Sequence, residues 1–395
     1  MRSRTIVVLL VVILAAASFS GANELLVNTS SKYGGIYGMR VVVSDTSPAY
    51  VETDSPTAET TITFRFYVNA NCLNLANGSN FSLFEGSDLS EVVWVRVVIE
   101  MVGADPAVYF EARKDDSTYS SSLMTVLPSG WHMIEVTWKA GSPGSLTAGM
   151  DNWAIDGIDS ITNSNGVIDV GRMGAVSGID GGTSGFIKFD DFASFRTDST
   201  IGPVSVFGDI SSSYTFFPEI HALYGSGVTG GCGSGNYCAD TSVTRGQMAA
   251  FILRAENLSV CFYDPPAGPG TPTFGDVGTG HQFYDLIEEF SAQGFTSGCG
   301  GGNYCPDSSV TRGQMSVFLL RGKYGTGFSP PACSGDSGFT DVPDSHPFCG
   351  WIKKLAEDGI TGGCGGGNYC PESPVTRGTM AAFLQRTYGL IRVLP

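Results

Sequence analysis

Basic residues and histidine are scarce in this chain. Its 395 residues include 22 lysines and arginines against 38 aspartates and glutamates, and only 4 histidines, which gives a formal net charge of −16. Because nucleic acids are bound by clustered lysine and arginine, this balance argues against a nucleic-acid partner. The excess of negative charge is typical of a protein kept in solution outside the cell, and solubility alone is enough to explain this excess.

Apolar runs long enough to cross a membrane are missing as well. A transmembrane helix needs roughly 20 consecutive apolar residues, and the run from Ile6 to Ala17 is shorter than that. This run follows Arg2 and Arg4 and precedes small residues, which is the arrangement of a secretory signal peptide. We therefore predict a signal peptide at 1–22, no transmembrane span, and export to the cell envelope or cell surface.

Three copies of one motif occupy the C-terminal half. Each copy has a Gly-Cys-Gly-x-Gly-Asn-Tyr-Cys loop followed by Val-Thr-Arg-Gly, and the Thr-Arg pairs begin at Thr244, Thr311 and Thr376, 67 and 65 residues apart. Each copy also opens with an aromatic residue two positions before an aspartate. Near-identical units at a steady period indicate a repeat architecture, in which neighbouring units bury one another's apolar faces.

Each unit is predicted to be a helix, a loop and a second helix. The apolar face of the first helix in unit one is assigned to Phe217, Ile220, His221 and Tyr224, at helical spacing. The second helix is predicted to begin at the threonine of Val-Thr-Arg-Gly, which a glutamine three residues later turns into a capping box in the first two units. The predicted units, separated by linkers rich in proline and glycine, are 206–258, 273–324 and 338–390.

These motifs resemble S-layer homology repeats over about residues 206–390. The resemblance implies an all-α, pseudo-threefold bundle whose grooves bind cell-wall glycans, often ones that carry acidic pyruvyl groups. It departs from the family in two ways: Thr-Arg-Gly-Gln or Thr-Arg-Gly-Thr replaces the usual Thr-Arg-Ala-Glu, and phenylalanine replaces the groove tryptophan. The residues at the replaced tryptophan positions are Phe217, Phe283 and Phe348.

By this resemblance, three arginines and three aspartates are expected to bind the glycan. Arginine makes charge-assisted bonds to carboxylates, and a helix N-terminus favours an anion. The glycine after each arginine is expected to leave room for the ligand. A purely structural ion pair between these arginines and aspartates is the alternative. The six residues are Arg245, Arg312, Arg377, Asp209, Asp276 and Asp341.

Ten cysteines in an exported chain indicate disulfides. A zinc site would need four ligands, and each repeated loop offers two thiols and no histidine. Cys72 and Cys261 are left over, either paired with each other or free. The predicted disulfides are Cys232–Cys238, Cys299–Cys305, Cys364–Cys370 and Cys333–Cys349.

Residues 24–198 have the texture of an all-β domain. Phe64, Phe66 and Val68 alternate with polar or exposed positions, as in a strand with one buried face. We predict a single antiparallel β-sandwich. The segments 130–138 and 185–192 resemble the laminin-G and concanavalin-like jelly rolls, whose members bind sugars or proteins and include some glycosidases.

Sequence motifs of catalysis are missing from this domain. A retaining glycosidase needs two carboxylates about 5 Å apart, yet Glu100, Glu111 and Glu135 each stand alone on their predicted strands. Asp190 and Asp191 are adjacent, so they are expected to point to opposite faces. They are instead candidate ligands of a structural calcium ion, as in some relatives, with plain solvation as the alternative. We therefore predict no enzyme activity and no other cofactor.

The most favoured function is an envelope protein held non-covalently by its repeats to a cell-wall polysaccharide or a peptidoglycan-linked glycan. The sandwich is then a displayed module with an unidentified carbohydrate or protein ligand. One alternative is a surface-layer or adhesion protein whose repeats bind protein subunits. The other is a secreted glycosidase anchored by the same repeats.

Overall fold

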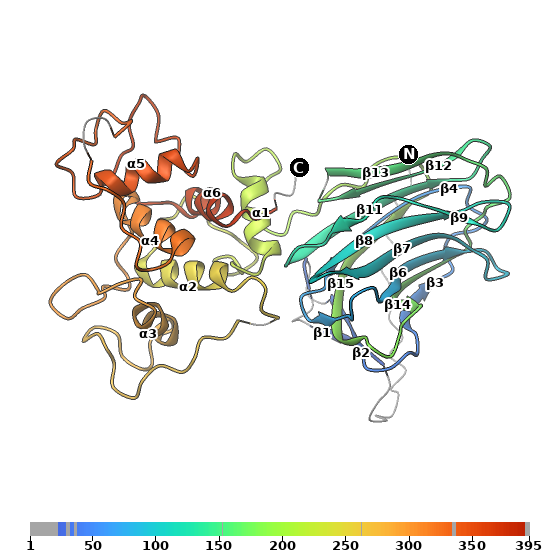
Figure 1. Cartoon of the computed structure of the whole chain (residues 1–395), viewed down its shortest axis with the longest axis horizontal. Coiled ribbons are helices and arrows are strands. Elements are labelled where there is room, and N and C mark those ends of the chain that lie inside the picture. Colours follow the sequence, from blue (N-terminus) through green and yellow to red (C-terminus); the bar gives the residue numbers. More distant parts are fainter. Residues whose placement is uncertain are drawn as a thin grey trace. The chain divides into compact units, whose positions relative to one another are not determined.

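The computed structural model describes residues 23–28, 32–34, 38–151, 153–261, 263–333 and 337–391. The chain divides into two compact units, residues 1–206 with 393–395, and residues 207–392 (Figure 1). The predicted signal peptide at 1–22 lies outside the described residues. Within them, every helix is too short or too polar to cross a membrane.

The first unit is a β-sandwich, as predicted, and its paired strands are antiparallel. The first sheet has the order β1-β2-β15-β4-β11-β12-β13, with β5 beside β15, and comprises β1 (Glu24–Asn28), β2 (Gly38–Val43), β4 (Thr61–Asn69), β5 (Leu73–Asn74), β11 (Trp131–Lys139), β12 (Gly144–Met150), β13 (Trp153–Ile161) and β15 (Ser184–Phe195). The second has the order β10-β8-β7-β6-β14-β3, with β9 beside β8, and comprises β3 (Ala49–Thr53), β6 (Asn80–Ser87), β7 (Val93–Val102), β8 (Asp105–Arg113), β9 (Tyr119–Ser121), β10 (Thr125–Val126) and β14 (Val170–Ser177).

The sandwich core lies between the two sheets. Phe64, Phe66 and Val68 of β4 are fully buried, but Thr63, Arg65 and Tyr67 between them are buried as well, so this strand is buried on both faces and not on one as predicted. Ile134 and Val136 on β11 stand opposite Phe66 and Phe64 and are buried with them. Because alternate residues of a strand face opposite sides, the polar residues between them lie on the outer face of the first sheet.

The segment after β15 was expected to be a linker, but it is hydrogen-bonded to that outer face. Arg65 of β4 donates to the carbonyl of Gly202 at 2.7 Å. Glu135 of β11 accepts the backbone N–H groups of Ile201 and Gly202 at 2.9 and 2.8 Å. The segment 197–204, whose contacts also include Thr197 and Val204, is therefore part of the sandwich unit.

The second unit contains six described helices, two in each repeat. In the first two repeats the predicted capping boxes form: Thr244 accepts from the backbone of Gln247, whose side chain accepts from the Thr244 N–H, and Thr311 does the same with Gln314. The third repeat has the threonine cap alone, at Thr376. The helices are α1 (Phe217–Gly225), α2 (Arg245–Glu256), α3 (Tyr284–Ala292), α4 (Arg312–Tyr324), α5 (Cys349–Glu357) and α6 (Arg377–Tyr388).

Backbone hydrogen bonds connect the three repeats in a closed cycle. The N–H of Val243 donates to the carbonyl of Val375 at 2.8 Å, Val375 donates to Val310 at 2.9 Å, and Val310 donates to Val243 at 3.0 Å. These valines directly precede the capping threonines. The starts of α2, α4 and α6 therefore meet at one place, and each repeat contacts both of the others there.

The aromatic residue at the start of the first helix is misassigned by one position in unit one. Phe283 and Phe348 are the N-caps of α3 and α5, and their equivalent in unit one is Phe216, the N-cap of α1, not Phe217, which the resemblance matched to them. Phe217 lies inside α1 and is buried, with its ring stacked on His221. Adjacent phenylalanines made the two registers hard to distinguish from periodicity alone.

Disulfides close the repeated loops and one lead-in segment. The second cysteine of each loop has a left-handed backbone, with φ of 58° at Cys238, 60° at Cys305 and 59° at Cys370. Cys72 and Cys261 are disulfide-bonded too, so neither is a free thiol. The loop and lead-in bonds join Cys232 to Cys238, Cys299 to Cys305, Cys364 to Cys370 and Cys333 to Cys349.

Candidate functional site

An aspartate holds the cysteine loop of each repeat. The two carboxylate oxygens of Asp209 accept the backbone N–H groups of Tyr237 at 2.8 Å and Cys238 at 2.7 Å. Asp276 and Asp341 accept the corresponding pairs of amides at 2.7 Å. Burial of the carboxyl alone would raise the pKa of Asp276, but these hydrogen bonds outweigh it and lower the pKa. The three predicted glycan-binding aspartates thus anchor their own loops.

The arginines after the capping threonines are buried and join neighbouring repeats. Arg245 is 6% exposed, and its Nε donates to the carbonyl of Tyr304 in the second repeat at 2.7 Å. The Tyr304 hydroxyl donates back to the Arg245 carbonyl at 2.8 Å, and the guanidinium lies 4.8 Å from the centroid of the Tyr304 ring. The same reciprocal contact joins Arg312 to Tyr369 and Arg377 to Tyr237.

The alternative of ion pairs between these arginines and the aspartates is wrong. Among the described residues, no ion pair within 4.0 Å involves Arg245, Arg312 or Arg377. Burial lowers the pKa of each guanidinium, and the nearby tyrosine and aspartate offset this only in part. The Nη2 atoms of Arg312 and Arg377 have no hydrogen-bond partner in the described structure. Each repeat therefore holds a buried cation without a paired anion.

A cavity of about 580 Å³ lies beside Arg245, and its walls come from all three repeats. The second repeat contributes Thr296 and the α4 side chains Gln314 and Arg321, and the third contributes Phe348. The Nη2 of Arg245 lies 3.5 Å from the hydroxyl of Thr296. Cationic, hydroxyl, amide and aromatic groups thus surround one space, which suits a polar ring with an acidic substituent.

Arg321 is a cavity residue that was not predicted as a site. Its Nη1 donates to the carbonyl of Phe295 at 2.6 Å. Arg254 and Arg386 make the equivalent bonds in the first and third repeats, to the carbonyls of Val228 and Ile360. The sequence signal was the arginine three residues after the phenylalanine of the second helix in every repeat, at Phe251, Phe318 and Phe383. By contrast, the predicted residues Asp209, Asp276 and Asp341 do not line this cavity.

The glycine after each of these arginines is covered by an aromatic ring, not open to a ligand. A Cβ atom on Gly246 would lie 2.7 Å from the ring of Phe283, and one on Gly313 would lie 2.7 Å from Phe348. Gly378 meets the ring of Phe216 in the same way, at 3.1 Å. The expectation that these glycines leave room for a ligand is therefore wrong. Each glycine lets the aromatic N-cap of the next repeat pack against the helix backbone.

Asp190 and Asp191 do not follow the simple alternation expected of a strand. The pairing of β15 with β4 is irregular between Asp190 and Ala193, and Asp191 has a left-handed φ of 48°. Burial, together with the charge of Asp191, raises the pKa of Asp190 to about 6. Asp190 accepts the backbone N–H groups of Tyr33 and Gly34 at 2.6 and 2.9 Å. Two adjacent carboxylates are thus held close together in a partly buried place.

These two carboxylates fit a hard cation. Oδ2 of Asp191 is buried and has no hydrogen-bond partner in the described structure. Burial also raises the pKa of Asp191, and the Arg65 guanidinium counters this only in part. Calcium takes carboxylate and backbone carbonyl oxygens, so Asp190 and Asp191 would supply anionic ligands to it. The donor chemistry is compatible with the predicted calcium ion.

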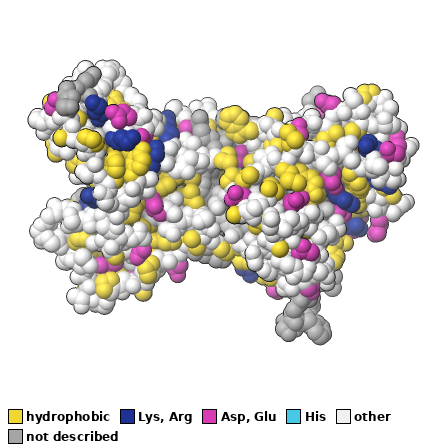
Figure 2. Space-filling view, viewed as in Figure 1, with side chains coloured by type: hydrophobic (Ala, Val, Ile, Leu, Met, Phe, Trp, Pro, Cys, Tyr) yellow, Lys and Arg dark blue, Asp and Glu magenta, His cyan; other side chains and the backbone are white. Residues whose placement is uncertain are grey.

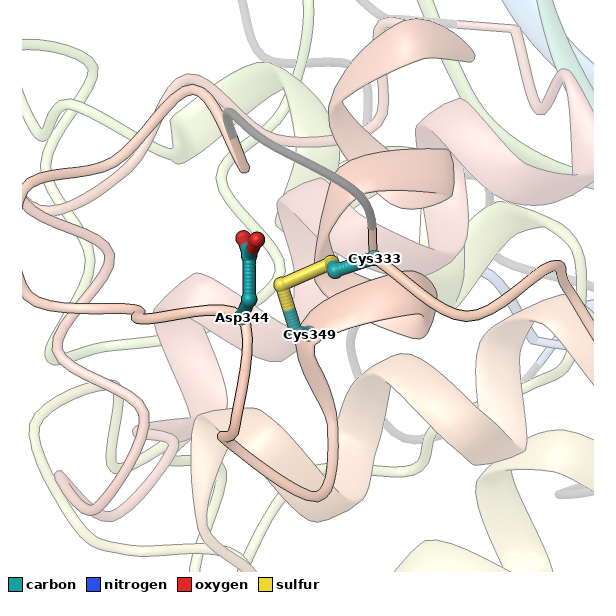
Figure 3. A group of neighbouring side chains, drawn as sticks. All are labelled: Cys333, Asp344 and Cys349. Atoms are coloured by element: carbon teal, nitrogen blue, oxygen red, sulfur yellow. A yellow bond between two sulfur atoms is a disulfide. The ribbon is translucent and has the colours of Figure 1, made fainter.

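Three metal-ligand side chains meet elsewhere, at Cys333, Asp344 and Cys349 (Figure 3). This is the one group of three or more histidine, cysteine, aspartate or glutamate side chains found among the described residues. Its two sulfur atoms are joined in a disulfide. Because metals bind the free thiolate, the group is a disulfide with a neighbouring carboxylate.

A buried histidine and aspartate pair connects the sandwich strands. Nδ1 of His132 on β11 lies 2.7 Å from Oδ2 of Asp151, and the other Asp151 oxygen accepts the backbone N–H of Met133. Burial acts to lower the pKa of His132, but the charge and hydrogen bond of Asp151 outweigh it and raise the pKa. His132 is therefore a paired strand residue and not a free ligand.

The described geometry defines a β-sandwich followed by three helical repeats that share one site. The S-layer homology domain model matches residues 206–249 and 338–381, which are the first and third repeats. The C-terminal half of the chain thus carries S-layer homology domains. The second repeat has the same loop contact, threonine cap and arginine contact as the other two.

Two curated proteins are similar in sequence. A cell surface protein of Thermoanaerobacter kivui is 30% identical over 119 residues, which cover 30% of this chain and 16% of that protein. An amylopullulanase of Thermoanaerobacterium thermosulfurigenes is 26% identical over 208 residues, covering 51% of this chain and 10% of the enzyme. This chain therefore matches about a sixth and a tenth of the lengths of these relatives.

A solved structure of a cellulose-induced protein is also similar, with 14% identity and a TM-score of 0.35. The match covers 44% of this chain and 86% of that one.

Proposed function

We propose that this chain is a non-catalytic envelope protein whose repeats anchor it to an acidic cell-wall glycan and whose sandwich is displayed as a binding module. The observation that carries the proposal is the set of buried arginines without paired anions. An unpaired charge inside a protein costs several kcal/mol, and a ligand carboxylate would supply the missing partner. The S-layer homology domains and the cell surface relative support placement at the envelope.

The cavity beside Arg245 supports a glycan as the ligand. It is large enough for a small molecule or a sugar unit, and Thr296 and Gln314 offer hydrogen bonds next to the guanidinium. Phe348 provides an aromatic wall, against which a sugar ring packs. These groups suit a small polar ring with a negative charge better than the larger and flatter surface of a protein subunit.

The closed cycle of valine and arginine contacts supports a pseudo-threefold bundle. Each repeat gives an arginine to the next repeat and receives one from the previous repeat. A threefold arrangement would place an equivalent groove in each repeat, at Arg245, Arg312 and Arg377. Several weak sites on one polymer would then act together, because the second binding event becomes intramolecular.

The same proposal holds that the chain is not an enzyme and that its sandwich binds a structural calcium ion. Within the described structure, no aspartate or glutamate lines the cavity beside Arg245, whereas glycoside hydrolysis uses a pair of carboxylates. Asp190 and Asp191 would hold a structural calcium ion in the sandwich. The amylopullulanase relative keeps a hydrolase as the second candidate, and release of reducing sugar by the full chain is its test.

Binding to purified cell-wall sacculi tests the anchoring. The full chain is expected to sediment with intact sacculi, less so at high salt, and not with sacculi stripped of their secondary polysaccharide. Because Arg245 also supports the fold, the informative variant is Arg245→Gln compared with Tyr304→Phe, which loses the reciprocal hydrogen bond but keeps the guanidinium. Equal binding by both folded variants contradicts the proposal, and weaker binding by Arg245→Gln alone supports it.

A further inference from the structure

One row of charged side chains crosses the second sheet of the sandwich. The register places Arg172 of β14 opposite Glu52 of β3 and also opposite Glu85 of β6. Arg96 of β7 stands opposite Glu85 on one side and Glu111 of β8 on the other. Negative and positive side chains therefore alternate over five neighbouring strands. Glutamates considered strand by strand do not indicate this row, because the row runs across strands.

The charges in the row are paired with their neighbours. Arg96 lies 3.6 Å from a Glu85 oxygen and 3.4 Å from a Glu111 oxygen. At the other end, Nε of Arg172 lies 2.7 Å from Glu52. The row has no strong excess of either sign, so it favours neither an anion nor a cation. It offers many hydrogen-bond donors and acceptors in a fixed order.

The row lies on the outer face of the sheet, yet its centre is sheltered. The core side of β7 and β8 carries Val97 and Phe110, both fully buried, and Arg96 and Glu111 alternate with them along the strands. Glu85 is only 5% exposed although it faces away from the core. Arg96 lies against the Glu85 carboxylate there, and the Ser177 hydroxyl donates to it. Acidic and basic side chains lie beside one another on the visible face of the sandwich in Figure 2.

Tyrosines border the row. Arg96 lies over the ring of Tyr119 at 4.5 Å, and Arg172 lies over the ring of Tyr50 at 5.3 Å. Tyr109 occupies β8 two residues before Glu111, on the same face, and is half-buried. Tyrosine combines an apolar ring with a hydroxyl group. The face thus provides apolar ring surface next to repeated polar groups.

We propose that this face binds an extended, uncharged polysaccharide that lies along the row, across the strands. Strands are spaced about 4.8 Å apart, which is close to the length of one sugar residue in an extended chain. Successive carboxylates and guanidiniums could then meet the hydroxyls of successive sugars. This inference deepens the proposed function by naming the ligand class of the displayed sandwich, and it does not depend on glycan binding by the repeats.

Native affinity electrophoresis of the full chain tests the inference. The gels contain one soluble polysaccharide each: amylopectin, mixed-linkage β-glucan or galactomannan as neutral probes, and polygalacturonate as an acidic one. At least one neutral probe is expected to retard the protein. Glu111→Gln and Arg172→Gln should each raise the dissociation constant about tenfold, which corresponds to about 1.4 kcal/mol, because each replaces a charged hydrogen-bonding group with a neutral one.

The matched control is Lys139→Gln, which removes an exposed ion pair with Asp198 from the first sheet. It should migrate like the unaltered chain, because Lys139 lies on the first sheet and the row lies on the second. No retardation by any neutral probe overturns the inference. Retardation that survives both row substitutions overturns it as well, and so does retardation by polygalacturonate alone.

Discussion

Arg245 and Tyr304, 59 positions apart in the chain, each donate a hydrogen bond to the other's backbone carbonyl, at 2.7 and 2.8 Å. The pair belongs to two different repeats and recurs twice more around the cycle. Arg245 thus supports the fold through its Nε, and the same side chain lines the cavity of about 580 Å³. The side chain thus has a structural role, and the ligand role that we propose for it would use the remaining atoms of the same guanidinium.

Removal of one tyrosine hydroxyl should weaken the contact between repeats. Tyr304 is fully buried, so Tyr304→Phe leaves the Arg245 carbonyl without its partner. We expect a loss of about 1 to 2 kcal/mol in the free energy of unfolding, measured by chemical denaturation of the full chain. Tyr109→Phe, at a half-buried tyrosine for which no hydrogen bond is observed in the described structure, is the control. A loss as large in the control would mean that the reciprocal bond contributes nothing.

A methyl group on the glycine after the arginine should disturb the packing of the next repeat. Gly246→Ala places a carbon atom 2.7 Å from the Phe283 ring, and overpacking of this kind typically costs about 1 to 3 kcal/mol. Gly230→Ala is the control, because a Cβ there meets no atom within 4 Å. Thermal unfolding should show a lower midpoint for the first variant only. Equal midpoints would show that Phe283 moves aside freely.

The sandwich should gain stability from calcium near neutral pH. The folded state holds the Asp190 carboxyl with a pKa of about 6, above its ordinary value of 3.8. Without metal, the folded state therefore binds more protons between about pH 4 and 6, and stability falls as pH rises through this window. Calcium is expected to raise the unfolding temperature at pH 7 and to have little effect at pH 4.

Asp190→Asn should remove both the calcium response and this pH dependence. Asp198→Asn, on an exposed side chain of the same unit, should retain them. A calcium response of unchanged size in Asp190→Asn would place the ion elsewhere.

The pair of His132 and Asp151 predicts a second loss of stability with rising pH, in a higher pH range than that of Asp190. Asp151 raises the pKa of His132 above 6.5 in the folded state, so the stabilisation is complete below pH 6.5 and declines as pH rises through the folded pKa. His132→Gln should therefore cost more stability at pH 6 than at pH 9. Urea unfolding at the two pH values measures this difference, and a cost that does not change with pH would contradict it.

Local sequence signals predicted the local structure well. The capping box of Thr244 and Gln247 depends on residues three positions apart, so the sequence contains all of it. The choice between Phe216 and Phe217 depended on which ring meets Gly378, a contact between residues about 160 positions apart in the chain. Periodicity cannot decide such a contact.

The charged row on the second sheet could not be predicted from the sequence for a similar reason. Glu85, Arg96 and Glu111 lie on three strands, and their alignment depends on strand register and on two bulges in the pairing of β6 with β7. A single sequence does not show these irregularities. The arginine and tyrosine contacts between repeats likewise depend on how the repeats are arranged around the cycle.

The bonds of the segment 197–204 to Arg65 and Glu135 determine where a mechanical load would enter the sandwich. Drag on a displayed domain held by its repeats pulls on the chain that connects the two units. That pull reaches β4 and β11, which lie in the interior of the first sheet, before it reaches β15 through the chain. The force is then shared by strands that are hydrogen-bonded on both sides, and no edge strand is peeled away first.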